Sequence, residues 1–324
     1  MGWFTSRGSK MTDSTNPNWE RELIAKLAND ALIEQRRRRR WGIFFKLLTF
    51  AYITFLLVVM VDWSSRADFA GGKKHTAMVE LNGIIAPGSD ASAERVSLAL
   101  QAAFKDKNTQ GVVMRINSPG GSPVQAQTIY DEMRRLRQKY PDIPLYAVVE
   151  DVCASGGYFV AAGADRIYVG KASIVGSIGV LMDGFGFTGT MEKLGVERRL
   201  LAAGENKGML DPFSPLDEKD KEHVKKLMGD IHQQFISVVR EGRGKRLKET
   251  PEIFSGLIWT GAQSIDLGLA DGIGSLDSIA RDVVKAEDIV DFSQREGIAE
   301  KVARRFGASI ASSVVETLMR ASIQ

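Results

Sequence analysis

Segments of β-strand character alternate with segments of helical character in the middle of the chain, and this alternation limits the possible folds more than any other feature. Strands are expected at 111–117, 143–150 and 166–170, with helices between them at 124–139 and 156–162. Strands joined in this way by crossover helices form a largely parallel sheet. We therefore predict an α/β fold built from βαβ units.

The 324 residues contain no internal repeat, so we expect one catalytic-sized domain. It begins with an apolar strand at 76–85, includes a long amphipathic helix at 216–243, and spans residues 76–284. Residues 285–324 are predicted to form an amphipathic helical tail, which either packs on its own domain or contacts a partner or a membrane surface. Its apolar stripe recurs every four residues and consists of Ile298, Val302, Phe306, Ile310, Val314 and Leu318.

The N-terminal part contains a long apolar run, "WGIFFKLLTFAYITFLLVVMV", at 41–61. Its length fits the roughly 20 residues that a helix needs to cross a bilayer, and its apolar character all the way round disfavours a buried core helix. Some forty polar residues precede it, which disfavours a cleaved signal peptide. We predict a transmembrane helix at 41–62, after a segment at 1–40 that contains a short helix at 19–35, and before a linker at 63–75.

Five arginines, Arg36 to Arg40, directly precede the apolar run. By the positive-inside rule they keep residues 1–40 in the cytoplasm. The domain is then expected outside the cytoplasmic, or inner, membrane of a bacterium, held there by one spanning helix. The net charge of +3 gives no indication of nucleic-acid binding.

Cysteine and histidine are too few for several kinds of site. The single cysteine, Cys153, allows no intrachain disulfide and no cysteine cluster for a metal. The three histidines, His75, His223 and His232, are scattered and lack the spacing of a zinc-binding helix. The sequence therefore predicts no metal and no cofactor.

Ser155 lies between small residues in "CASGGYF", just after an apolar strand. A serine hydroxyl attacks a carbonyl only when a base removes its proton and nearby donors stabilise the oxyanion. Backbone amides in glycine turns and at helix starts are such donors, and Gly156, Gly120 and Gly121 are candidates. Taken alone, each segment is better explained as an ordinary strand-to-helix turn, because glycine-rich turns are common.

Three segments in this order, "INSPGG", "ASGGYFVAAGAD" and "GSIGV", resemble the signal peptide peptidase A family of membrane serine peptidases. That family belongs to the crotonase-like and Clp protease-like fold group. The resemblance extends from 76 to 282 and includes "LGLADGIGS" at 267–275. It implies a crotonase/Clp protease-like fold.

The family uses a serine–lysine dyad, with its lysine in a "GxYK" segment. That segment here is "GENKGMLDPF", so the resemblance assigns the general base to Lys207, although Asn206 stands where tyrosine is common. An ordinary lysine has a pKa of about 10.4 and stays protonated at neutral pH, so we expect its apolar neighbours to bury it. These neighbours are Met209, Leu210 and Phe213.

Three further residues near the motifs have alternative roles. Ser177 either orients the lysine ammonium, as the equivalent family position does, or is a turn or helix-cap serine. Cys153 is a second candidate nucleophile, but it precedes the helix start and is typical of a small buried residue. Asp165 is expected to be structural.

The resemblance implies a membrane-bound serine endopeptidase. Its substrates would be released signal peptides and other short unfolded hydrophobic peptides, held in apolar pockets lined from 179–187. It also implies a homo-oligomeric ring in which neighbouring subunits share each site. Two alternatives remain. A catalytically silent scaffold is disfavoured by the presence of both Ser155 and Lys207, and acyl-CoA chemistry fits poorly with a site outside the cytoplasm.

Overall fold

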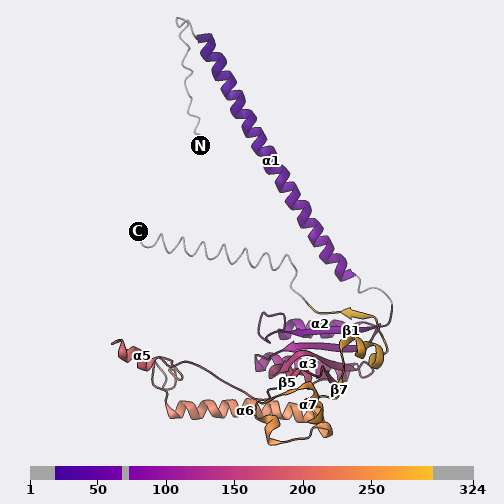
Figure 1. The fold of residues 1–324 in the computed structure, drawn as a ribbon. Helices are drawn as coiled ribbons and strands as arrows, with labels where there is room; N and C mark the ends of the chain where they lie inside the picture. Colours follow the sequence, from indigo (N-terminus) through magenta and orange to yellow (C-terminus); the bar gives the residue numbers. More distant parts are fainter. Residues whose placement is uncertain (1–18, 68–72, 295–324) are drawn as a thin grey trace. The chain divides into compact units, whose positions relative to one another are not determined.

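The computed structural model describes residues 19–67 and 73–294, which divide into two units. One contains a single long helix, α1 (Trp19–Ala67). The other lies within Ala70–Gly297 and has the α/β architecture predicted from the sequence. Figure 1 shows its sheet with helices packed around it.

Eight strands form one sheet in the second unit, and its main path follows the order β6-β5-β3-β2-β1-β8. All pairs are parallel except β5 with β6, and β4 adds to β3 and carries β7. The strands are β1 (His75–Asn82), β2 (Thr109–Ser118), β3 (Leu145–Ala154), β4 (Arg166–Val169), β5 (Ile174–Gly176), β6 (Ile258–Thr260), β7 (Gly272–Ile273) and β8 (Ile289–Asp291).

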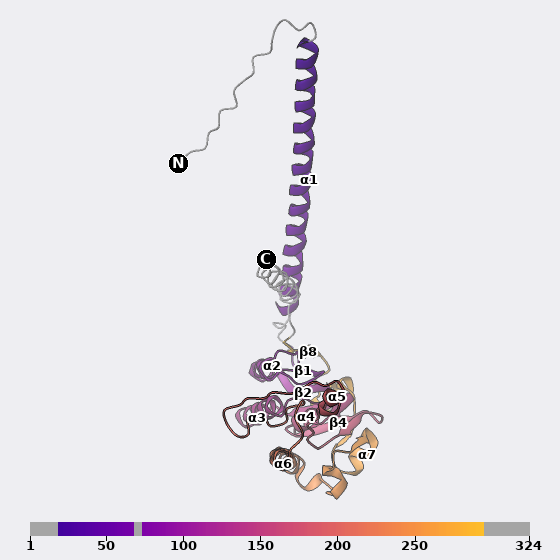
Figure 2. The same ribbon diagram turned by 90° about the vertical axis from the view of Figure 1, so that its left-hand side faces the viewer.

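Helices join the parallel strands as crossovers, and the three between β1 and β4 contribute to the main apolar core (Figure 2). The predicted strands and helices of this region are confirmed, with shifts of a few residues at their ends. The helix between β1 and β2 was not among the expected elements. The helices are α2 (Ala93–Lys105), α3 (Pro123–Lys139), α4 (Gly156–Ala161), α5 (Thr188–Lys193), α6 (Glu218–Arg243), α7 (Gly261–Asp266) and α8 (Leu276–Ser278), with the 3-10 helices η2 (Gly244–Arg246) and η3 (Pro251–Phe254) and the π-helix η4 (Ile279–Val284).

The two faces of the sheet bury different side chains. One face packs on α2, α3 and α4 through residues such as Val79, Met114 and Ala147, all fully buried. On the other face, Val113 and Val148 pack with Ile279 of η4. The alternation of inward and outward side chains along each strand produces this division.

The domain extends beyond its predicted end at residue 284. Strand β8 pairs with β1, and the amide of Phe292 donates to the carbonyl of Met78. A three-residue strand on the sheet edge carries little pattern of its own, so residues 285–294 were expected to belong to the tail. The predicted helical stripe from Ile298 lies outside the described residues.

The predicted transmembrane helix at 41–62 is not borne out. Helix α1 does cover these residues, in one continuous helix with the predicted segment at 19–35. However, no helix among the described residues is long and apolar enough to cross a membrane. The location at the inner membrane, inferred from that span, stays a prediction.

A buried charged pair fixes the end of α6 to the sheet. Arg243 is 1% exposed and donates to the Asp271 carboxylate at 2.8 Å, while Arg246 approaches the other oxygen at 3.1 Å. The Asp271 carboxylate also accepts from the Ile167 amide of β4 at 2.7 Å. Burial alone would raise the pKa of Asp271, but the bonds from Arg243 and Ile167 outweigh it and hold that pKa below its ordinary value.

We expect Asp271→Ala to lower the free energy of unfolding by about 3–5 kcal/mol near neutral pH, because Arg243 is left buried without its counter-ion. The depressed folded pKa means that the aspartate stabilises the protein fully above its unfolded pKa of about 3.9. This contribution is lost as the pH falls through the folded pKa. Urea denaturation should therefore show the difference from wild type shrinking as the pH falls below the unfolded pKa of about 3.9. The exposed Asp142→Ala is the control; a pH-independent difference for Asp271→Ala would contradict the assignment.

Candidate active site

Ser155 lies between the end of β3 and the start of α4 in a backbone conformation that serine rarely adopts. Its φ is 51° and its ψ is −123°. Its amide donates to the carbonyl of Gly176 at 2.8 Å, and its carbonyl accepts from Phe159 at 3.0 Å. Such a conformation costs on the order of 1–3 kcal/mol and persists only when its surroundings enforce it. Its Oγ makes no hydrogen bond within the described part of the chain, so the hydroxyl is free for chemistry.

A bulge in β3 sets the direction in which the strand reaches Ser155. Ile116 pairs with Val149 but Ser118 pairs with Cys153, so β3 contains extra residues opposite Asn117. The Asn117 side chain accepts from the amide of Val152 at 3.3 Å, and the hydroxyl of Ser173 donates to the carbonyl of Glu150. Bulges often redirect a side chain beside an active site.

The glycine turn after β2 packs directly against Ser155. At Gly120, where φ is +100°, an added Cβ would lie 2.6 Å from the amide nitrogen of Gly156 and 2.8 Å from the Cβ of Ser155. At Gly121, where φ is +149°, it would collide with the carbonyl of Ile85. Both positions therefore require glycine. The structure thus brings Ser155, Gly156, Gly120 and Gly121 together at the carboxyl edge of the sheet.

The three candidate oxyanion donors are not equivalent. The Gly120 amide donates to the side-chain oxygen of Ser118 at 3.2 Å. The amides of Gly121 and Gly156 have no acceptor among the described residues, and Gly156 is the first residue of α4, where amides lack helical partners. An ideal Cβ on Gly156 would lie 3.3 Å from the Gly121 nitrogen. Gly121 and Gly156 therefore offer two neighbouring free donors, whereas the Gly120 donor is already used.

Lys207 lies on a different part of the unit. Residues 179–217, named the arm here, connect β5 to α6 and include α5. Figure 1 shows α5 beyond the N-terminal end of α6, away from the sheet. The Lys207 side chain is exposed and makes no hydrogen bond or ion pair with Ser155 in the described structure. The expected burial by neighbouring apolar residues is therefore wrong for a single chain, because Leu210 and Phe213 are themselves 41% and 42% exposed.

Ser177 lies near Ser155 but makes neither of its predicted contacts. It directly follows Gly176, which pairs with Ala154, so the ends of β5 and β3 lie side by side. Its amide donates to the carbonyl of Leu257 at 2.7 Å, and its φ is 51°. It does not begin a helix, and its side chain makes no hydrogen bond in the described structure.

The remaining candidates do not supply a nucleophile or a base. Cys153 is fully buried, and burial raises the pKa of its thiol. Asp165 pairs with Arg137 and accepts from the amide of Leu145, as expected for a structural residue.

None of the histidines contacts Ser155, although His232 of α6 lies 3.2 Å from the carbonyl of Ile178. Within the described residues, no group of three or more His, Cys, Asp or Glu side chains is placed to hold a metal ion.

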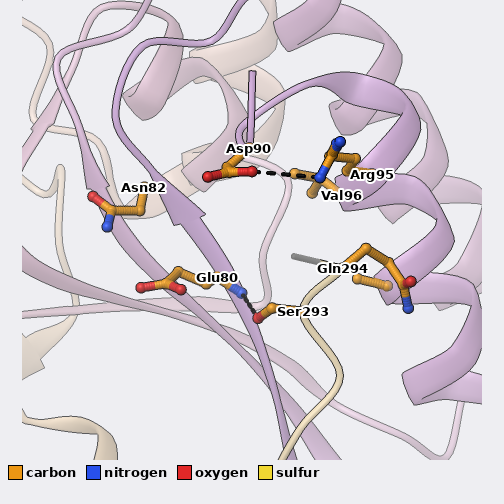
Figure 3. Close-up of a pocket in the computed structure, with 8 residues that line it drawn as sticks. Glu80, Asn82, Asp90, Arg95, Val96, Ser293 and Gln294 are labelled. Carbon is orange, nitrogen blue, oxygen red and sulfur yellow. Dashed lines mark hydrogen bonds and ion pairs between the residues drawn. The ribbon is translucent and has the colours of Figure 1, made fainter. Parts of the chain in front are cut away.

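Two cavities differ in size and lining. A cavity of about 610 Å³ lies between the arm and the first half of α6, with apolar walls that include Phe185, Leu210 and Met228. The second, beside β1 and α2, is lined by charged and polar side chains such as Glu80 and Arg95 (Figure 3). Its volume of about 20 Å³ holds no more than a water molecule. Of these two, only the first is large enough for a side chain of a peptide. Two shallower hollows, of about 540 Å³ along α6 and about 330 Å³ at α5, are also present in the described structure.

Comparison with known proteins identifies the family of the chain. The model of peptidase family S49 matches residues 137–289, and the Clp protease model matches residues 77–174. A putative protease of Methanocaldococcus jannaschii is 31% identical over 250 residues, which cover 74% of this chain and 78% of that protein. The chain belongs to peptidase family S49. A putative signal peptide peptidase SppA of Enterococcus faecium is 30% identical over 221 residues, 64% of each chain.

A larger relative matches only in part. The Na(+)/H(+) antiporter NhaA of Brucella abortus (strain 2308) is 44% identical over 209 residues, which cover 63% of this chain but 28% of that protein. The S49 chain thus spans about a quarter of that relative, and the likeness concerns one part of it.

The residues that hold the candidate site in shape were not predicted from the sequence. Ser118 bonds to the Gly120 amide, Asn117 supports the β3 bulge, and Ser173 bonds to that bulge from the β4–β5 connection. The "NS" of "NSPGG" is Asn117 and Ser118, but only the three-dimensional contacts reveal the roles of these two residues.

We expect Gly120→Ala to abolish the reactivity of Ser155 toward a fluorophosphonate, with a loss of at least about 100-fold in rate. The added methyl group would occupy the space between Gly156 and Ser155 and displace the donor amides. Gly229→Ala on α6 is the matched control, since an added Cβ there meets nothing within 4 Å. If Gly120→Ala were labelled at the same rate as the wild type, the close approach of Gly120 to Ser155 would not be needed for the reactivity of Ser155.

Proposed function

We propose that this chain is a serine endopeptidase with Ser155 as nucleophile and Lys207 as general base. The observation that carries the proposal is the strained turn at Ser155, with its unbonded hydroxyl next to the free amides of Gly121 and Gly156. Acyl transfer requires a nucleophile and two such donors within reach of one carbonyl. Membership of peptidase family S49 supports the same chemistry.

The reaction has two acyl-transfer steps. The Ser155 Oγ attacks the peptide carbonyl carbon as its proton passes to the neutral Lys207 amine, and the carbonyl oxygen becomes an oxyanion held by the two amides. The intermediate collapses, the C–N bond breaks, and the Lys207 ammonium returns the proton to the leaving amine. Lys207 then takes a proton from water, which attacks the ester; collapse of the second oxyanion expels the Ser155 oxygen, which regains its proton from Lys207.

Lys207 requires surroundings that one chain does not provide. An ammonium in water stays protonated at neutral pH, and only desolvation favours the neutral amine that a base must be. The arm that carries Lys207 also exposes large apolar side chains, among them Leu181, Phe185 and Leu201, the last at 98%. Apolar surface of this extent is typical of an interaction site. We infer that a second copy of the chain covers the arm in a homo-oligomer, and that Lys207 completes the site of a neighbouring subunit.

The substrate class follows from the cavity beside the arm. Its volume of about 610 Å³ and its apolar walls suit hydrophobic side chains of an extended peptide. The relative from Enterococcus faecium is named a signal peptide peptidase. We propose released signal peptides and other short unfolded hydrophobic peptides as substrates.

One observation favours a rival function, a catalytically silent scaffold. In a single chain the base is exposed and makes no contact with the nucleophile. A scaffold would not need the strained Ser155 turn, the turn glycines whose close packing leaves no room for a side chain, or the two free amides. The two functions differ in whether Ser155 reacts.

We expect a fluorophosphonate probe to label the wild-type chain at Ser155, as mapped by peptide mass spectrometry. Ser155→Ala should lose the label and at least about three orders of magnitude in the rate of peptide hydrolysis, because the nucleophile is gone. Ser264→Ala, a buried serine whose Oγ bonds to Gly261, should remain active. Failure of the wild-type protein to label or to cleave hydrophobic peptides would favour the scaffold.

The shared site predicts complementation between two inactive variants. Ser155→Ala keeps Lys207, and Lys207→Ala keeps Ser155, so each protein alone should be inactive. Co-expressed, some neighbouring chains bring an intact serine and an intact lysine into one site. Activity should return in part and be greatest when the two variants are present in equal amounts.

The control is a mixture of each inactive variant with the double variant, Ser155→Ala with Lys207→Ala, which offers no complete dyad across any interface. Mixed oligomers that demonstrably contain both single variants but remain inactive would place the dyad within one chain.

A further inference from the structure

Ser118 ends β2 and is fully buried beneath the glycine turn of the site. Its hydroxyl donates to the carbonyl of Gly83 at 2.6 Å and accepts from the amide of Gly120 at 3.2 Å. A serine hydroxyl has one proton, and the Gly83 carbonyl can only accept, so the oxygen is left as the acceptor for Gly120. One side chain therefore connects the turn after β1 with the turn after β2.

A second contact fixes the next peptide group. The carbonyl of Gly120 accepts from the amide of Ile85 at 2.9 Å. In a trans peptide the N–H points opposite to the C=O, so the Gly121 N–H points away from Ile85. It lies on the side of Gly156, where an ideal Cβ would be 3.3 Å from the Gly121 nitrogen. The direction of the Gly121 N–H thus depends on how the Gly120–Gly121 peptide is held.

We propose that Ser118 is a positioning residue of the oxyanion hole. It engages the Gly120 amide, and this leaves the next amide, that of Gly121, as the donor directed toward the substrate oxygen. The inference rests on the proposed peptidase function, because the oxyanion that it serves forms only during acyl transfer. Ser118 acts through the backbone and does not itself contact the substrate.

Removal of the hydroxyl has a defined consequence. The buried Gly120 amide would lose its acceptor, and a buried unsatisfied donor is costly enough to turn the peptide toward another partner. The Pro119–Gly120 peptide is joined to the Gly120–Gly121 peptide at the Gly120 Cα. Its rotation shifts that carbon and with it the direction of the Gly121 amide, and hydrogen bonds weaken steeply with misalignment. The loss falls on the transition state, because the ground-state carbonyl needs these donors less than the oxyanion does.

The test compares Ser118→Ala with Ser264→Ala in the full-length chain. Both serines are fully buried and donate to a backbone carbonyl, but Ser264 bonds to Gly261 of α7. Ser118→Ala should lower kcat for peptide hydrolysis at least about tenfold with KM within about twofold, while Ser264→Ala keeps both constants. Thermal unfolding measured on both separates lost stability from lost catalysis. Ser118→Cys preserves the size of the side chain with a weaker acceptor, and should give an intermediate kcat.

Unchanged kcat in Ser118→Ala, with an active wild type, would overturn the positioning role but not the peptidase function. A wild type that neither cleaves peptides nor reacts at Ser155 would instead reject the peptidase function. In that case amide hydrogen exchange still decides the structural claim: the Gly120 amide should exchange faster in Ser118→Ala than in wild type and in Ser264→Ala. Equal exchange in all three would reject the role of Ser118.

Discussion

Backbone packed directly on backbone at the carboxyl ends of β2 and β3 is the contact on which the site depends. Gly120 lies so close to Ser155 and Gly156 that no side chain fits at its position. This contact holds the Ser155 turn at φ 51° and keeps the free amides of Gly121 and Gly156 beside its hydroxyl. The parallel sheet makes the contact possible, since it places the ends of neighbouring strands at one edge.

The sequence predicts this part well, for a physical reason. Alternating strands and helices specify a parallel sheet, and glycine at two turns marks a close approach that larger residues would prevent. The stabilising contacts around them are less visible in the sequence. Ser118, Asn117 and Ser173 look like ordinary polar residues until the fold brings each next to the backbone group that it binds. Strand β8 was missed because three residues at a sheet edge show no periodicity.

One expectation failed because it depends on surroundings and not on pattern. Lys207 was expected to be buried by its sequence neighbours, but those neighbours belong to an exposed arm and are themselves open to solvent. For the membrane-spanning helix, inferred from the length and all-round apolar character of the run at 41–61, no helix among the described residues is long and apolar enough to cross a membrane. For Lys207, a local run of apolar residues was taken as evidence of burial, although burial is a property of what packs against the run.

The exposed arm and the preorganised oxyanion donors indicate how peptidase activity and assembly are connected in the proposed enzyme. The nucleophile and its donors are preorganised within one chain, because backbone contacts of the sheet fix them without help from the arm. The base is not, because Lys207 lies exposed on the arm and makes no contact with Ser155 in a single chain. If a second copy of the chain supplies the missing desolvation, an isolated chain holds a reactive geometry without a functioning base. Peptide hydrolysis would then begin only where copies meet, and an unassembled chain would not cleave the unfolded polypeptides around it.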